Sequence, residues 1–359
     1  MIQVYYGCNR AGQAEAVSES RLDQINQMKK GSLERRNLAR RKLVRFCVKC
    51  TASLALCCLL SCRKSPPTVA AIPRTCGTLL WEAEHTGLQS VASTSGINIY
   101  WNAPMREDDV QGQIDVLTSA IGRGARGVII SPVEALPLRT PVQRALDHGT
   151  PIVVVGSDLG LAPGKNLAYV LNDERTGGQM AARRIGGLLG GEGTVAVMGI
   201  SNRLTSTAAR DRSLETTLAQ EFPGIHVVFR SLALPTVSQE QQVAERLLLE
   251  SPNIGVIVAL SEFSTRGAYY ALTENERTPA IRLIGFDQNL IAPIRTGAID
   301  SVIMQNTYQM GRAAMTLMVQ ELHEGAMEHE VWQQPVLVTK TNLDSTVVRE
   351  ILDLSWFTK

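Results

Sequence analysis

Cysteine is nearly absent from most of this 359-residue chain. Six of the seven cysteines lie within residues 1–62, and only Cys76 lies beyond them. A body with a single cysteine cannot form an internal disulfide, so an oxidising compartment is permitted without being required. The five histidines form no His-Glu-x-x-His pattern, and no Gly-x-Ser-x-Gly pattern occurs. We therefore expect a protein that is not an enzyme.

Excess positive charge is confined to the beginning of the chain. Residues 1–61 contain eleven Lys/Arg and four Asp/Glu, so the net charge of +2 leaves −5 on residues 62–359. An acidic body argues against nucleic-acid binding, which needs a basic surface. The glycine-rich stretch 186–193 follows a predicted helix, whereas a phosphate-binding loop precedes one. Cys47 and Cys50 have metal-ligand spacing without a second pair, so we expect neither a cofactor nor a metal.

Residues 1–61 are interpreted as a leader. The basic stretch Lys29–Lys49 precedes eleven uncharged residues, Cys50–Leu60. This run is too short to span a bilayer, which takes about 20 apolar residues, but it fits the apolar core of a signal peptide. Residues 1–27 show no export signal, and Met28 is the better start.

Cys62 is the candidate lipidation site. The stretch Leu59–Cys62 (LLSC) resembles a bacterial lipobox, in which a cysteine after a small residue receives a lipid, and residues 62–67 then form a tether. Secretion without an anchor and a chance apolar run are the alternatives. The lipobox favours a periplasmic or cell-envelope location, with the protein anchored to the membrane by lipid.

From residue 68 onward, short β-branched runs alternate with amphipathic stretches. This alternation predicts βαβ units and parallel sheets. The expected strands are 68–72, 97–100, 127–130, 152–155 and 168–171, then 194–198, 226–229, 255–260, 282–286 and 301–303. The expected helices are 81–95, 108–123 and 138–148, then 174–189, 208–221, 238–251, 264–275 and 308–323. We predict an α/β fold with two doubly wound parallel-sheet lobes, whose shared cleft lies at the carboxyl ends of the strands.

Six stretches occur in an order and spacing that together are distinctive. They are Thr68–Arg74, Gly127–Pro132, Pro151–Asp158, Ala208–Arg212, Ile284–Asp287 and Met304–Gln305. With these stretches, residues 67–340 resemble the type I periplasmic binding proteins, in particular the ribose/galactose-type sugar-binding proteins of bacterial ABC transporters. The resemblance implies a hinge with several crossovers, an N-terminal lobe of residues 68–172 and 306–335, and a C-terminal lobe of residues 173–305 and 336–359.

The resemblance also implies which residues hold the sugar. Arg212 corresponds to the arginine that grips sugar hydroxyls, although a surface ion pair with Asp211 or Glu215 would also explain it. Asp287 corresponds to the cleft aspartate that accepts from two hydroxyls, with a helix cap as its alternative. Gln305 corresponds to a glutamine near the last crossover, where a hinge hydrogen bond is the other possibility.

Two further positions follow from the resemblance. Trp81 corresponds to one of two adjacent aromatic residues that pack on the sugar ring, and Leu80 replaces the other; a core tryptophan is the alternative. Asp173 corresponds to an aspartate of the first crossover, where a structural role is equally consistent. His85 lies one helical turn after Trp81 and is a weaker candidate for the cleft.

Besides Leu80, the chain departs from the ribose type at three places. Gly156 and Ser157 replace an Asp-Arg pair, and Pro235 replaces an aromatic residue. Ser261 and Glu262 replace an Asn-Asp pair. Asp158, Ser261 and Glu262 are therefore predicted to form a rearranged polar set for another monosaccharide or polyol.

The expected function is that of a substrate-binding protein of a sugar ABC transporter. Its partners would be a small sugar and a membrane permease, and we expect a monomer that binds no nucleic acid. The alternatives are a sensory sugar receptor and the effector domain of a lactose-repressor-type regulator. The regulator would need an N-terminal helix-turn-helix, whereas residues 29–62 carry a basic run, an apolar core and a lipobox.

Overall fold

The computed structural model describes residues 66–201, 205–277 and 280–352, which belong to one compact unit. The expected leader, the start at Met28, most of the tether and Cys62 lie outside these residues. Within the described ranges, no helix is long and apolar enough to cross a membrane.

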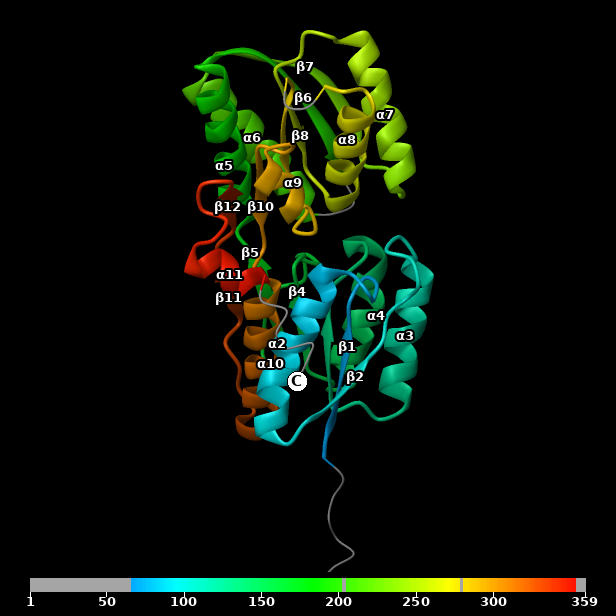
Figure 1. Cartoon of the computed structure of the whole chain (residues 1–359). Helices are drawn as coiled ribbons and strands as arrows, with labels where there is room; N and C mark the ends of the chain where they lie inside the picture. The colour runs from blue at the N-terminus through cyan, green and yellow to red at the C-terminus, as the bar shows by residue number, and fades with distance from the viewer. Residues whose placement is uncertain (1–65, 202–204, 278–279, 353–359) are drawn as a thin grey trace, which may run out of the picture. The chain divides into compact units, whose positions relative to one another are not determined.

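The N-terminal lobe is built on a six-stranded parallel sheet with the order β11-β5-β4-β3-β1-β2 (Figure 1). Helices α2 and α10 cover one face, and α3 and α4 cover the other. The strands are β1 (Thr68–Ile72), β2 (Asn98–Trp101), β3 (Gly127–Ile130), β4 (Ile152–Val155), β5 (Leu167–Asn172) and β11 (Glu330–Gln333). The helices are α2 (Leu79–Ser95), α3 (Val110–Gly122), α4 (Ala135–Asp147) and α10 (Thr307–Glu324).

The C-terminal lobe has a second six-stranded sheet with the order β12-β10-β9-β8-β6-β7. Helices α5 and α6 cover one face, and α7, α8, α9 and α11 cover the other. The strands are β6 (Glu192–Ile200), β7 (Gly224–Leu232), β8 (Val256–Ala259), β9 (Arg282–Gly285), β10 (Ser301–Met304) and β12 (Val336–Thr339). The helices are α5 (Glu174–Leu189), α6 (Thr205–Glu221), α7 (Val237–Glu250), α8 (Glu262–Glu274), α9 (Ile291–Thr296) and α11 (Thr346–Leu352).

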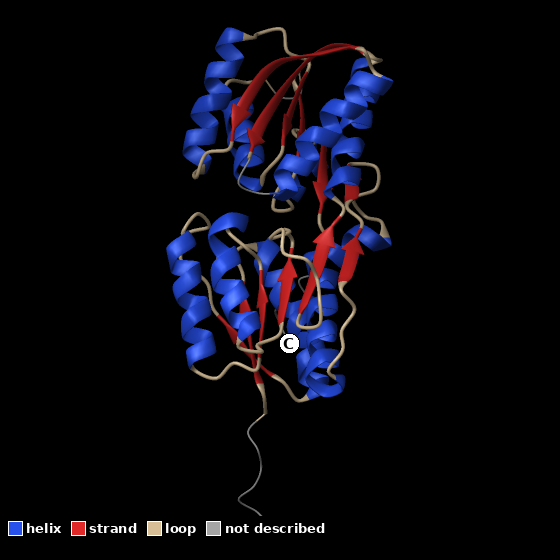
Figure 2. Cartoon of the chain, turned by 180° about the vertical axis from the view of Figure 1, so that it is seen from behind, coloured by secondary structure: helices blue, strands red, loops and turns tan. Residues whose placement is uncertain are grey.

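The inner strands are apolar on both sides because each sheet lies between two layers of helices (Figure 2). Successive side chains of a strand point to opposite faces. In β1, Val69 and Ala71 pack with α2 and α10, whereas Ala70 and Ile72 pack with α3 and α4. This arrangement confirms the predicted α/β fold with two sheets covered on both faces.

Two strands were not among those expected from the sequence. β11 pairs in parallel with β5, and β12 pairs antiparallel with β10. Two parallel sheets were predicted, so the second sheet differs from the prediction at β12. The chain therefore passes between the lobes three times: between β5 and α5, between β10 and α10, and between β11 and β12.

Glycines let neighbouring helices approach each other closely. A Cβ atom added at Gly87 of α2 would lie 2.1 Å from the carbonyl oxygen of Tyr308 in α10. A Cβ atom added at Gly178 of α5 would lie 2.3 Å from the carbonyl oxygen of Arg210 in α6. The second contact matters for the site, because it sets how closely α6 approaches α5.

Candidate ligand-binding site

A cavity of about 340 Å³ lies where the carboxyl ends of the parallel strands of both lobes meet. Loops that follow β1, β2, β3 and β4 line it on one side, and loops that follow β7, β8, β9 and β10 line it on the other. Such strand ends are the usual ligand site of open α/β sheets. Its polar lining residues are Arg74, Glu84, Glu107, Asp108, Glu134, Ser201, Ser206, Thr207, Arg210, Ser261, Glu262, Asp287, Gln288, Gln305 and Thr307.

Arg210 is the buried cation on the C-terminal side of this cavity. Its Nη2 atom donates to Oε1 of Glu174 at 2.8 Å, its Nε atom donates to Oε2, and its Nη1 atom donates to the carbonyl of Leu260 at 2.7 Å. Gln305 donates from Nε2 to Oε1 of Glu174 at 2.7 Å. The guanidinium also lies 4.4 Å from the centroid of the Phe286 ring. These contacts fix Arg210 in one orientation against the cavity.

Arg212 is exposed and lies outside the cavity lining, so its predicted grip on the sugar stays a prediction that the lining does not support. Two residues correspond to about 200° around an α-helix, so Arg210 and Arg212 lie on opposite faces of α6. Arg210 shares the buried face with Leu214, four residues further on. The spacing of four residues from a buried leucine was the sequence signal that places Arg210 on the buried face of the helix.

Arg266 joins two carboxylates on the same side of the cavity. Its Nε atom donates to Oδ2 of Asp287 at 3.0 Å, and its Nη2 atom donates to Oε1 of Glu262. Asn289 donates its side-chain amide to both carboxylates, at 3.1 Å to Glu262 and 2.9 Å to Asp287. Burial, followed by the charges of Asp287 and Glu107, raises the pKa of Glu262 to about 7, and Arg266 opposes this rise.

Trp81 and Arg74 form the opposite wall. The indole Nε1 of Trp81 donates to Oε1 of Glu107 at 3.2 Å, and the Arg74 guanidinium lies 5.6 Å from the indole centroid. Arg74 donates from Nε to the carbonyl of Pro132 at 2.8 Å and from Nη2 to Oγ of Ser157 at 2.9 Å. Both groups are therefore held in place by the protein before any ligand contact.

Glu84 is a buried carboxylate behind the same wall. The residue is 2% exposed, and its carboxylate accepts from Oγ of Ser131 at 3.1 Å. Burial raises the pKa of Glu84 to about 7, with Ser131 and Arg74 acting in the opposite direction.

Five of the eight predicted ligand residues line the cavity, and three do not. Trp81, Ser261, Glu262, Asp287 and Gln305 are in the lining. Their contact with a ligand stays a prediction. Ser261 also caps α8, with its hydroxyl accepting from the amide of Ser264 at 3.2 Å.

Asp158 and Asp173 have local partners and lie outside the cavity lining, so their contact with a ligand stays a prediction that the lining does not support. Asp158 is exposed, and its carboxylate accepts from the amide of Gly160 at 2.6 Å within its own loop. Asp173 caps α5 by accepting from the amide of Thr176 at 3.0 Å, which is the structural alternative considered for it. In both residues the carboxylate bonds to nearby backbone, as short acidic side chains commonly do.

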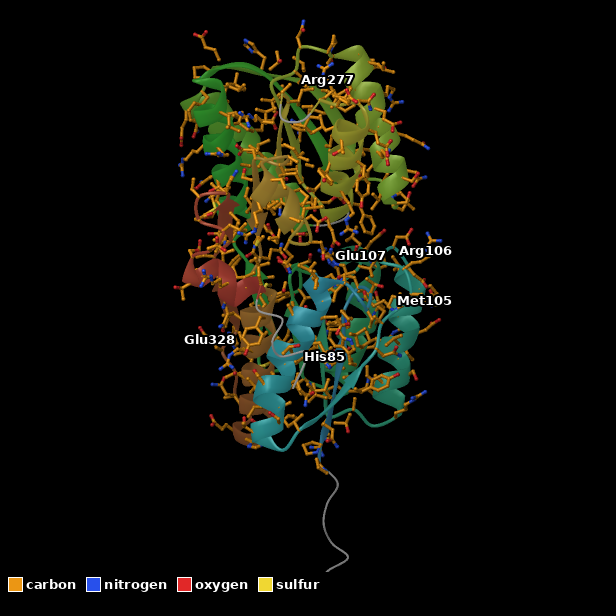
Figure 3. All side chains as sticks on the ribbon, in the orientation of Figure 1. His85, Met105, Arg106, Glu107, Arg277 and Glu328 are labelled. Carbon is orange, nitrogen blue, oxygen red and sulfur yellow. The ribbon has the colours of Figure 1, made fainter. Side chains whose placement is uncertain are left out.

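His85, the weaker candidate, also lies outside the lining. Its ring stacks on Trp101 with the centroids 4.3 Å apart, and Nδ1 lies 3.5 Å from Glu82. Figure 3 shows His85 well down the N-terminal lobe, whereas Glu107 lies at the edge of that lobe that carries the cavity.

Arg74, Glu84, Glu107 and Arg210 were not predicted from the sequence. Arg74 follows the end of β1 by two residues, and Glu107 lies in the loop that follows β2. Both could have been found from the rule that ligands lie at the carboxyl ends of parallel strands. Glu84 had a weaker signal, a charged residue on the apolar face of a helix.

This fold and cavity define a two-lobed solute-binding protein, and comparisons with known proteins agree. The family model described as periplasmic binding protein domain matches residues 69–326. The chain therefore belongs to the periplasmic binding protein family.

Three similar proteins illustrate the match. The chain is 25% identical to a putative rhizopine-binding protein of Rhizobium meliloti, over 74% of this chain and 87% of that one. It is 24% identical to a xylitol-binding protein of Mycolicibacterium smegmatis, over 76% and 77% of the two chains. A carbohydrate transporter solute-binding protein of Agrobacterium radiobacter, solved in complex with D-arabinose, has a TM-score of 0.74 and 23% identity, over 80% and 99%. These matches support the binding-protein interpretation over the transcriptional regulator.

Proposed function

We propose that this chain binds a monosaccharide or polyol in the cavity and presents it to the membrane permease of an ABC transporter. The observation that carries the proposal is the lining itself. It combines hydrogen-bonding groups held by the protein, such as Arg210 and Asp287, with the rings of Trp81, Phe263 and Phe286. Sugars offer hydroxyls to the first set and an apolar C–H face to the second.

Both lobes contribute groups, so ligand binding favours the arrangement in which they are close. The lobes already touch beside the cavity, where Oγ of Ser157 lies 3.4 Å from Oγ of Ser206 and Oγ1 of Thr205 lies 3.3 Å from the carbonyl of Asp158. The three crossings after β5, β10 and β11 would act as the hinge.

The proposal also covers the location of the protein, its permease partner, its anchoring and its oligomeric state. The relatives carry the names of binding and import proteins, which supports a periplasmic or cell-envelope location and a permease partner. Anchoring through Cys62, a monomeric state and the absence of catalysis belong to the same proposal. In the described residues, no cluster of His, Cys, Asp and Glu suits a metal ion.

A calorimetric titration of the full chain with monosaccharides and polyols tests this function. We expect one compound class to bind with a one-to-one ratio and with an affinity that Asp287→Asn lowers. The absence of binding by every sugar and polyol would contradict the proposal.

A further inference from the structure

Two carboxyl groups of the cavity wall are tied to each other by the same two side chains. Arg266 donates from Nε to Oδ2 of Asp287 at 3.0 Å and from Nη2 to Oε1 of Glu262. The side-chain amide of Asn289 donates to Oε1 of Glu262 at 3.1 Å and to Oδ1 of Asp287 at 2.9 Å. Glu262 and Asp287 line the cavity, whereas Arg266 and Asn289 lie outside the lining. Arg266 and Asn289 therefore bridge the two carboxyl groups from outside the cavity.

Asp287 has few hydrogen-bond acceptor sites left for a ligand. A carboxylate offers about four such sites, two on each oxygen. Oδ1 of Asp287 accepts from the backbone amide and from the side-chain amide of Asn289, each at 2.9 Å, and Oδ2 accepts from Arg266. The Asp287 side chain is also 0% exposed. At most one site therefore remains, on Oδ2, and a second ligand hydroxyl needs another acceptor.

Glu262 supplies that second acceptor. Its Oε1 atom accepts from Arg266 and Asn289, whereas its Oε2 atom has no hydrogen-bond partner among the described residues. The Glu262 side chain is 12% exposed and lies in the cavity lining. Burial raises the pKa of Glu262 to about 7, and a proton taken up near neutral pH resides on Oε2, because Oε1 already accepts two hydrogen bonds. Oε2 is thus available to a ligand hydroxyl in both protonation states, as an acceptor or as a donor.

We infer that Glu262 is the main hydroxyl-binding group of the C-terminal wall, through Oε2, and that Arg266 and Asn289 are positioning residues that act through it. This inference rests on the proposed function and specifies how the site selects its ligand. Both carboxyl groups bond to one guanidinium, so they lie close enough for two adjacent hydroxyls to reach both. The ligand therefore presents a vicinal diol to this wall, with one hydroxyl at Oε2 of Glu262 and the other at Oδ2 of Asp287.

Two single variants measure the contributions of Glu262 and Arg266. Calorimetric titrations of the full chain with a panel of monosaccharides and polyols, which includes D-arabinose, D-ribose, xylitol and myo-inositol, identify the probe. Glu262→Gln should lower the affinity for this probe by about tenfold or more, because an NH2 group that cannot accept replaces Oε2. Arg266→Met should lower it by about tenfold, because Glu262 loses a donor that orients its carboxyl group.

The double variant shows whether Arg266 acts through Glu262. In the Glu262→Gln background, Arg266→Met should lower affinity by no more than about twofold, because the oxygen that Arg266 positions is already gone. A merely structural role of Arg266 would lower affinity equally in both backgrounds.

Arg184→Met is the matched control. The Arg184 side chain is 33% exposed, against 25% for Arg266, and it forms a bidentate pair with Asp300 outside the cavity lining. Its replacement should leave affinity within about twofold. Asn289→Ala removes the second bridge between the carboxyl groups, and its loss of affinity should also shrink in the Glu262→Gln background. This variant keeps the test valid if Arg266→Met fails to fold.

The possible failures are distinguishable. If a probe binds but Glu262→Gln or Arg266→Met leaves its affinity within about twofold, the role assigned to Glu262 is wrong and the proposed function stands. The same conclusion follows if the loss caused by Arg266→Met is equal in both backgrounds. If no compound of the panel binds, the proposed function fails and this inference fails with it.

Discussion

Arg210 and Glu174 form a bidentate ion pair that joins α6 to α5 beneath the cavity. Both side chains are buried, with 8% and 6% of their surface exposed. A buried pair of this kind is costly to break, because the remaining charge has no partner. The pair is therefore both part of the binding site and part of what holds the C-terminal lobe together.

Replacement of the two neighbouring arginines should have opposite outcomes. Arg210→Met removes hydrogen-bond donors from the cavity and should weaken ligand binding by about 100-fold, or roughly 2.7 kcal/mol. Arg212→Met, on the exposed face of the same helix, should leave affinity within about twofold. Calorimetric titration compares the ligand affinities of the two variants. A larger loss of affinity for Arg212→Met than for Arg210→Met would favour Arg212 as the sugar-binding arginine.

Breaking the pair should also affect stability. Arg210→Met leaves Glu174 buried without a cation and should lower the free energy of unfolding by about 3–5 kcal/mol. Adding Glu174→Gln removes the unpaired charge, so the double variant should be more stable than Arg210→Met alone. Urea denaturation measures both, and a double variant whose losses simply add would show that the two residues are not coupled.

Two glycines of α5 provide a matched pair for helix packing. Gly178→Ala places a methyl group against the α6 backbone and should destabilise the protein by about 1–3 kcal/mol and weaken binding through displacement of Arg210. Gly187→Ala meets no atom within 4 Å and should stabilise it by about 0.5–1 kcal/mol. Thermal unfolding with a ligand titration checks both, and equal effects at the two positions would contradict the packing described here.

Trp81 should report ligand binding by fluorescence. Its indole lies in the cavity wall, so a ligand that packs on it should change its emission, and Trp81→Phe should abolish the change. Trp332→Phe, 54% exposed on β11, should keep it. Trp81→Ala should lower affinity by about 2 kcal/mol, as for other buried aromatic contacts. A signal that persists in Trp81→Phe would place the ligand elsewhere.

Glu240 should make stability depend on pH. The residue is 0% exposed, one carboxylate oxygen accepts from the amide of Leu234 at 2.8 Å, and the other has no hydrogen-bond partner among the described residues. Burial raises its pKa from 4.5 to about 7. The folded state therefore holds a proton that the unfolded state has released, so this contribution to stability is present below about pH 4.5 and is lost as the pH rises through about 7.

Glu240→Gln keeps the acceptor for Leu234 and removes the titration. The stability of this variant relative to the unsubstituted protein should therefore increase with pH, by a few kcal/mol at most. Urea denaturation at several pH values measures the difference, with Glu250→Gln, exposed on the same helix, as the control. A difference that does not change with pH would mean that Glu240 is not held neutral.

The sequence predicted the repeating elements well, because their signals are local. The apolar run Ile152–Val155 and the helix Glu174–Leu189 were expected with the bounds that the structure shows. β11 and β12 were missed because they are partly exposed and lack the continuous buried apolar run of the inner strands, and their pairing depends on distant strands. Edge strands of this kind carry little periodicity of their own.

The site was predicted less completely, for two reasons. Asp173 has a residue type that suits both a helix cap and a ligand contact, and only the observed bond to Thr176 distinguishes them. Glu107 and Glu262 line the same cavity from segments far apart in the chain, so no local pattern records that they share it. Spacing within α6, in contrast, did contain the information that favours Arg210 over Arg212.

The most direct test of the binding cleft is thermal unfolding of the full chain in the presence of a panel of neutral and amino sugars and polyols. A ligand at 100 times its dissociation constant should stabilise the folded protein by about 2.7 kcal/mol, and Asp287→Asn should remove most of this gain. A panel that leaves the unfolding temperature unchanged, or a gain that is the same in Asp287→Asn, would contradict the assignment of this cavity as the sugar site.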